Sequence, residues 1–274
     1  MAAGWVAVGA SAGRGLSDGE IVRGFDFRVV EVLDREFTKT LGIVDDDGNT
    51  IWRCRVDGVE ALWKRGGSWH RNQRGQLVEL KPAFGLPKIG CSLVQDHAGQ
   101  WGVLMRFHGD GRNLTDVPAR HWQQDARVVE QLLRTALFDL AIGNNNRLKR
   151  NYLWLGAEAG VLPIDEEKAL DFEGLVTFRM DQATRAAMWA GLRRFPLSRV
   201  VAGLRSTLSV EMVEQVASRV FHAEHARLLA TELVARLGDL EAELYRYLGS
   251  RYADGKRAGI PSKRARGPQP WDGY

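Results

Sequence analysis

Two side chains with hard oxygen atoms flank a short segment in the middle of the chain. Asn151 and Asp165 are fourteen residues apart, and two apolar stretches lie between them, around Ala157-Glu-Ala-Gly160. This pattern favours a hairpin that carries both side chains at its open end. An amide oxygen and a carboxylate oxygen suit Mg²⁺, which prefers hard oxygen ligands. The spacing therefore places two hard oxygen atoms at the open end of one hairpin.

The elements on either side of the hairpin must hold it in place. From Asp125 to Ala141 apolar residues recur at helical spacing, which predicts a buried helix that stops at Gly143. Further helices are expected after Ser209, a capping residue, and over 223–248. Earlier in the chain, β-rich runs occupy 27–34, 40–44, 50–56, 59–64, 91–96 and 101–107.

This order of elements predicts an α+β protein with two lobes. We expect an N-terminal extension over 1–25, a β-rich lobe over 26–107 and a helical lobe with the hairpin over 108–250. The β-rich lobe should contain an antiparallel sheet, with a short helix within 76–87. Residues 251–274 read as a basic flexible tail. The plan disfavours the regular alternation of strand and helix in a Rossmann fold.

The composition is that of a globular protein. The chain has 274 residues, of which 45% are hydrophobic and 26% are charged. It has no apolar run of about 18 residues, the length of a membrane-spanning helix, and no basic region typical of a secretory signal at its start. Cys54 and Cys91 are the only cysteines, too few for a disulfide framework. We expect a cytoplasmic protein.

Much of the net charge of +4 comes from the tail. Basic residues dominate the segment 251–266, where Asp254 is the only acidic residue. Such a segment can bind the phosphates of nucleic acid or another anionic surface. It can equally be a solubilising end without a partner. The sequence leaves both alternatives open.

Two further motifs suggest other chemistry. "GASAGRG" (9–15) has the glycine spacing of a dinucleotide-binding turn, but no strand–helix–strand units follow it. "FHAEH" (221–225) places two histidines three residues apart, and a zinc site would need further ligands. We interpret the first as a turn of small residues and the second as an exposed helix start.

The segment "FDLAIGNNNRLKRNYLWLGAEAGVLPIDEEKALDF" (138–172) resembles the catalytic core of the HipA-like and lipid-kinase-like atypical kinases. In that family an apolar helix ends in D-x-x-I-G-N, and Asp-Arg-His-x-x-Asn, a hairpin and Ile-Asp follow. The resemblance is loose elsewhere and extends over roughly 50–248. It implies a two-lobed protein-kinase-like fold, with a β-rich N-lobe and a helical C-lobe.

The resemblance also implies ATP and Mg²⁺ as cofactors and a hydroxyl of a protein or small molecule as the acceptor. Asn151 and Asp165 would hold the metal. Lys64, near the end of a strand, and Glu79, on the short helix, would take part in binding the nucleotide. Lys81 or Lys88 is an alternative to Lys64.

The chain departs from the family's pattern at its catalytic loop. Asn146 stands where the family has the Asp that takes the acceptor's proton, and Leu148 replaces the His. Asn146 and Lys149 would therefore be the catalytic residues, with the Asn146 amide positioning a hydroxyl and Lys149 either stabilising the γ-phosphate or simply covering the surface. An amide is not a base near neutral pH, and losing a general base typically lowers a rate by about 10²–10⁴-fold. Asp139 or Glu166 is an alternative base.

Three functions follow from these features. The first is an ATP-dependent phosphotransferase of the HipA-like kinase type. The second is a catalytically impaired pseudokinase that binds nucleotide or serves as a scaffold, with nucleic acid as one partner. The third is a transferase with another chemistry, such as nucleotidyl transfer. The residue that separates them is Asn146.

Overall fold

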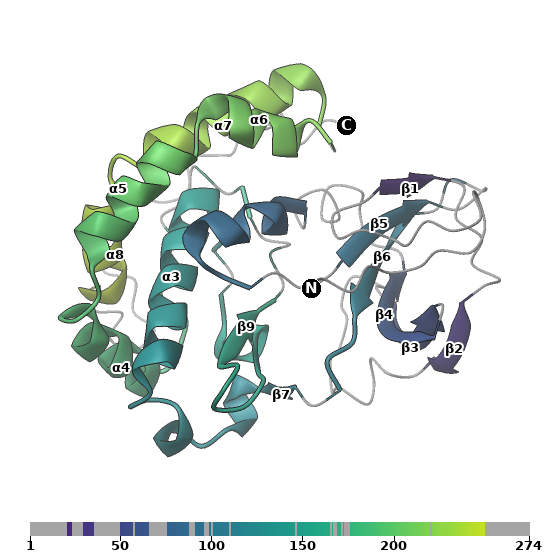
Figure 1. Ribbon diagram of the computed structural model, residues 1–274, viewed down its shortest axis with the longest axis horizontal. Coiled ribbons are helices and arrows are strands. Elements are labelled where there is room, and N and C mark those ends of the chain that lie inside the picture. The colour runs from purple at the N-terminus through teal and green to yellow at the C-terminus, as the bar shows by residue number, and fades with distance from the viewer. Residues whose placement is uncertain are drawn as a thin grey trace, which may run out of the picture. The chain divides into compact units, whose positions relative to one another are not determined.

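A computed structural model describes residues 21–23, 30–35, 50–56, 58–65, 76–87, 91–95, 99, 101–109, 111–145, 147–164, 166, 169–170, 172, 176–219 and 221–249. The chain divides into two compact units, one of residues 1–76 and 88–110 and the other of residues 77–87 and 111–274. The first contains a β-sheet and the second is mainly helical, so the predicted α+β class is confirmed (Figure 1). No helix among the described residues is long and apolar enough to cross a membrane.

The first unit contains a six-stranded sheet in the order β1-β5-β6-β4-β3-β2. Its strands are β1 (Ile21–Arg23), β2 (Glu31–Asp34), β3 (Thr50–Val56), β4 (Val59–Arg65), β5 (Cys91–Gln95) and β6 (Trp101–Arg106). Strands β3 and β4 form the predicted hairpin, and Gly58 adopts φ 79° in its turn, a conformation that glycine accepts without strain. The expectation of an antiparallel sheet is wrong at one edge. Strand β1, which we had placed in an N-terminal extension, pairs with β5 in parallel.

The second unit is organised around a long helix and a small sheet. Its helices are η2 (Gln76–Phe84), η3 (Leu114–Asp116), η4 (Ala119–His121), α3 (Ala126–Ile142), η5 (Lys149–Asn151), α4 (Gln182–Leu192), α5 (Leu197–Thr207), α6 (Val210–Ala217), α7 (Ala223–Arg236) and α8 (Leu240–Gly249). Its three-stranded sheet has the order β7 (Arg112–Asn113), β8 (Tyr152–Trp154), β9 (Val161–Pro163). The predicted hairpin is thus β8–β9.

Helix α3 begins and ends where the sequence predicted. The Asp125 side chain caps it by accepting hydrogen bonds from Arg127 N at 2.9 Å and Val128 N at 3.4 Å. At the other end Gly143 adopts φ 65°, and its N–H donates to Asp139 O, which terminates the helix.

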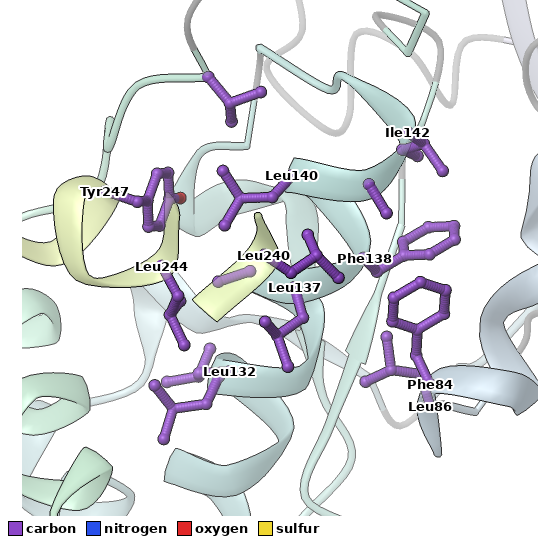
Figure 2. Close-up of a cluster of buried hydrophobic side chains, with 14 of the residues drawn as sticks. Phe84, Leu86, Leu132, Leu137, Phe138, Leu140, Ile142, Leu240, Leu244 and Tyr247 are labelled. Carbon is purple, nitrogen blue, oxygen red and sulfur yellow. The ribbon is translucent and has the colours of Figure 1, made fainter. Parts of the chain in front are cut away.

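The core of the second unit surrounds α3. On one side of this helix, Leu137 and Leu140 are buried in the same apolar cluster as Leu244 and Tyr247 of α8 (Figure 2). On the other, Phe138 meets Phe84 edge to face, with ring centroids 5.2 Å apart. The segment 77–87, which the sequence analysis counted with the β-rich lobe, therefore belongs to the helical unit, because its apolar side chains are buried with those of α3.

The predicted single helix over 223–248 is wrong in one respect, since it consists of two helices. The chain turns at 237–239, where Gly238 weakens the helix. Arg205 donates from Nε to Leu237 O at 3.0 Å and from Nη2 to Gly238 O. Its side chain therefore supplies hydrogen bonds to carbonyl groups that have no donor within the helix at this break. Leu228 of α7 is 48% exposed.

Candidate functional site

A buried arginine lies at the centre of the predicted catalytic loop. The side chain of Arg147 is only 1% exposed. It donates to both carboxylate oxygens of Asp139, from Nε to Oδ2 at 2.8 Å and from Nη2 to Oδ1 at 2.9 Å. This two-pronged geometry matches a planar guanidinium to a carboxylate and fixes the arginine side chain against helix α3.

Arg147 also joins the loop to the hairpin. Its Nη1 donates to Asn151 O at 3.3 Å and to Ile164 O, while Ile164 N donates to Asn151 O at 2.9 Å. The backbone of Asn151 is therefore bonded to the residue that precedes Asp165. Asp165 itself and Asn146 lie outside the described residues. What the structure brings together is Asn151 and Ile164, the residue before Asp165.

The side chain of Asn151 is oriented by its own loop. Its Oδ1 accepts a hydrogen bond from Leu148 N at 2.9 Å, and the residue is 5% exposed. An amide oxygen has two lone pairs, so it can accept such a bond and bind a cation at the same time. The donor chemistry of Asn151 therefore fits a magnesium ion, for which Asp165 would supply the carboxylate.

The predicted alternative bases are not available. Asp139 is fully buried, and besides Arg147 it accepts a hydrogen bond from Asn144 Nδ2 at 2.8 Å. Glu166 is 3% exposed, and its Oε1 lies 2.7 Å from Lys81 Nζ and 3.0 Å from Arg147 Nη2. Because both carboxylates are buried and bonded to cations, a substrate hydroxyl cannot reach them to give up its proton. The expectation that Asp139 or Glu166 replaces the missing base is therefore wrong.

Lys81 is likewise excluded as the lysine that contacts the nucleotide. It is fully buried, pairs with Glu166 and donates from Nζ to Pro163 O at 2.7 Å. Burial lowers the pKa of Lys81, although Glu166 opposes this effect. Burial raises the pKa of Glu166, but Lys81 and Arg147 outweigh it and bring the pKa below its ordinary value. The lowered pKa of Glu166 fits a carboxylate that stays ionised beside two cations, whereas the lowered pKa of Lys81 reflects its burial.

Helix α3 also holds the closed end of the hairpin. Gln131 Nε2 donates to Ala159 O at 3.3 Å, and its Oε1 accepts from Val161 N at 2.9 Å. Arg127 donates to Ala157 O and Glu158 O in the same turn. Because Arg147 is bound to Asp139 at the open end, one helix positions both ends of the hairpin.

Lys149, predicted to face the γ-phosphate, has protein partners. Its Nζ lies 3.1 Å from Asp181 Oδ2 and 5.3 Å from the centre of the Trp122 ring. Asp181 also caps α4, since its Oδ1 accepts from Thr184 N at 2.7 Å. The Lys149 side chain is 17% exposed, and a phosphate would compete with Asp181 for it.

The other predicted nucleotide lysine lies on the sheet of the first unit. Lys64 is opposite Ile51 of β3 and Val103 of β6, and the next pair on the same face of the sheet is Leu62 and Met105. All five side chains are half-buried, whereas the opposite face holds the buried core of this unit. A lysine within a partly open apolar surface can bind phosphate beside a flat apolar ring such as adenine.

Glu79, predicted to act with Lys64, belongs to η2 in the other unit and is half-buried. Lys88, the motif at 9–15 and the tail at 251–274 lie outside the described residues. His222 precedes α7 and is exposed, and the described residues include no group of three or more His, Cys, Asp or Glu that could hold a metal.

Sequence reasoning missed the buried network of Lys81, Arg147 and Glu166. A signal was present for Lys81 and for Asp139, because each directly follows an apolar residue within a predicted helix. Lys81 follows Leu80, and Asp139, the partner of Arg147, follows Phe138; both apolar residues are fully buried. Charges at such positions are rarely buried without a partner.

The comparisons with known proteins give structural neighbours only. No protein-family model and no curated protein matches the chain. The proinflammatory kinase CtkA of Helicobacter pylori is similar in structure, with a TM-score of 0.48 and 10% identity over 81% of this chain and 99% of that chain. A chain of the Shewanella oneidensis HipA, HipB and operator DNA complex is similar at a TM-score of 0.43 and 13% identity, over 80% and 72% of the two chains.

At these TM-scores and identities the two similarities carry no argument about the fold or function of this chain. The roles of individual residues are therefore argued from this chain's own contacts.

Proposed function

We propose that this protein is an ATP-dependent phosphotransferase of the kinase type, which acts on a hydroxyl group of a protein or small molecule. The observation that carries the proposal is the bond from Ile164 N to Asn151 O at 2.9 Å, reinforced by Arg147. It brings the residue before Asp165 next to Asn151, which supports the proposal that an amide and a carboxylate oxygen share one ion. Magnesium bound there would neutralise charge on the ATP phosphates.

In the proposed reaction the bond between the γ-phosphorus and its bridging oxygen breaks, and the acceptor oxygen forms a new bond to that phosphorus. ADP leaves with the bridging oxygen. Asn151 and Asp165 would hold an ion that neutralises phosphate charge, and the Asn146 amide would position the acceptor. The acceptor's proton passes to water or a phosphate oxygen, because Asp139 and Glu166 are engaged with cations.

A second candidate function is a pseudokinase that binds nucleotide without transferring phosphate. Two observations favour it. Asp139 and Glu166 are paired with cations and are not available as bases, and an asparagine, Asn146, stands in the place of the catalytic Asp. Nucleic acid bound by the basic tail, and nucleotidyl transfer as another chemistry, stay among the proposals that the sequence raised.

Single-turnover transfer from ATP labelled at the γ-phosphate tests both candidates. The wild type should transfer phosphate slowly to itself or to a generic hydroxyl acceptor. Asn146→Asp should raise the rate, by up to about 10²-fold, because it supplies the missing carboxylate. No transfer by either protein would contradict the phosphotransferase and leave the pseudokinase. Transfer of an α-labelled nucleotide would instead indicate nucleotidyl transfer.

A further inference from the structure

Two large aromatic side chains are exposed on neighbouring helices of the second unit. Trp189 of α4 is 44% exposed and Tyr245 of α8 is 49% exposed. Their rings meet edge to face, with centroids 6.3 Å apart, and α4 packs against α8 (Figure 1). The two rings therefore form one surface that solvent reaches, which we call the aromatic surface.

Arginines flank the aromatic surface on α4. Arg185 and Arg193 lie four residues before and four residues after Trp189, so all three belong to one stripe of the helix. Arg193 is exposed, whereas Arg185 is half-buried and the carbon of its guanidinium lies 4.7 Å from the centre of the Phe178 ring. Residues 182–210, which include α4 and α5, contain five arginines and no Asp or Glu. These two helices therefore add positive charge beside the rings.

Acidic side chains on the adjoining segments have partners of their own. Asp181, which caps α4, pairs with Lys149. On α8, Glu243 pairs with Arg246, and Glu241 accepts a hydrogen bond from a serine of α5. Two of these three carboxylates thus compensate a lysine and another arginine, and not the arginines that flank the aromatic surface.

The basic tail begins beside the aromatic surface. Gly249 is the last residue of α8, and a Cβ placed on it would lie 3.9 Å from Cζ3 of Trp189. From Gly249 the chain continues into the segment 251–266, which contains six Lys and Arg residues and one acidic residue. The sequence thus attaches a second group of positive charges next to the aromatic surface.

Exposed rings beside repeated positive charge fit a ligand that has both flat groups and repeated negative charge. Single-stranded nucleic acid combines these features, because its unpaired bases stack on aromatic side chains while its phosphates bind Arg and Lys. A duplex keeps its bases stacked on one another, and an acidic peptide has the charges without a series of flat rings. The aromatic surface therefore favours a single strand.

We propose that the aromatic surface of α4 and α8 is a binding site for single-stranded nucleic acid. A base stacks on Trp189 or Tyr245, and Arg193 binds a phosphate of the same strand. The site lies within the second unit and goes beyond the proposed phosphotransfer, because neither its residues nor its test involve ATP.

The test is fluorescence polarisation of labelled oligothymidylate and oligouridylate, titrated with the full chain at low salt. Trp189→Leu keeps an apolar, helix-forming side chain but removes the ring, so it should raise the Kd by at least about 5-fold. Trp189→Phe retains a flat ring and should bind nearly as tightly as the wild type. Tyr245→Leu removes the other ring and should weaken binding in the same direction, so the test holds if one of the variants does not fold.

Arg193→Gln tests the phosphate contact through the salt dependence of binding. Loss of one phosphate contact should make the slope of log K against the logarithm of the salt concentration shallower by about 0.7. The matched controls are Arg227→Gln and Leu228→Ala on α7, which change an exposed arginine and an exposed apolar residue elsewhere in the same unit. Both should leave the Kd and the slope unchanged.

Tighter binding of one oligomer than of the other would support the proposal and identify DNA or RNA as the source of the ligand. The proposal is overturned if the wild type binds neither oligomer at low salt. It is also overturned if Trp189→Leu binds as tightly as the wild type, which would assign binding to the tail or to net charge, or if a duplex binds as tightly as the single strand. Binding of oligoglutamate that depends on Trp189, without binding of the oligonucleotides, would assign the surface to an acidic protein segment instead.

Discussion

At the scale of single residues, Arg147 decides how the loop is arranged. Its guanidinium is bonded to Asp139, to Glu166 and to the backbone of Asn151, which are separated in sequence. A lysine could replace its charge but not its planar set of donors. The arginine is therefore needed for its shape as well as for its charge.

Arg147→Lys should lower the free energy of unfolding by about 3 kcal/mol, because it breaks a buried network and leaves carboxylate oxygens without donors. Urea denaturation at neutral pH measures the change. Arg134→Lys is the control, since Arg134 pairs with the half-exposed Glu130 at 2.8 Å, and it should change stability by less than about 1 kcal/mol. Equal effects of the two substitutions would contradict the central role of Arg147.

At the scale of elements, helix α3 positions the catalytic loop because the helix ends in a sharp turn. Gly143 turns the chain into the loop with φ 65°, and Asn144 then bonds back to Asp139 through its backbone N–H and its side chain, both at 2.8 Å. A second unusual backbone conformation follows the hairpin. Leu170, φ 68°, is the only described non-glycine residue with positive φ, and its N–H donates to Ile142 O at 2.7 Å. The strained turn returns the chain to the end of α3.

Gly143→Ala should lower the free energy of unfolding by about 1–2 kcal/mol, because a Cβ disfavours the left-handed conformation. The control is Gly203→Ala inside α5, where nothing lies within 4 Å of the added Cβ. That substitution should raise stability by about 0.5–1 kcal/mol. Thermal denaturation, monitored by circular dichroism, compares the two substitutions. The two substitutions should change the free energy of unfolding in opposite directions. Stabilisation by Gly143→Ala would show that this turn is not required.

At the scale of the whole molecule, periodicity predicted more of the fold than of the site. The strands β3 to β6 and the helix α3 were recognised because their apolar residues repeat at a regular interval and their ends carry Gly or Asp signals. Helices α4 and α5 were missed. The segment 77–87 was assigned to the wrong unit, since its partner, Phe138, is more than fifty residues away in sequence.

The site shows the same limit. Spacing alone predicted that Asn151 and the end of the hairpin lie together, because a hairpin is a local structure. The ion pairs of Lys81 with Glu166 and of Arg147 with Asp139 depend on tertiary packing. No local sequence pattern specifies which buried charges pair with one another. A charged residue next to buried apolar residues was the available signal, and it indicates that a partner exists without naming it.

The central claim is that Asn151 and Asp165 bind magnesium together with ATP, and calorimetry on the wild type and Asp165→Ala tests it most directly. We expect the wild type to bind ATP at least about 10-fold more tightly with Mg²⁺ than in EDTA. Asp165→Ala should lose this difference while it still binds ATP in EDTA and unfolds at a similar temperature. Equal Mg²⁺-dependent affinity in the two proteins would remove Asp165 from the site and contradict the account.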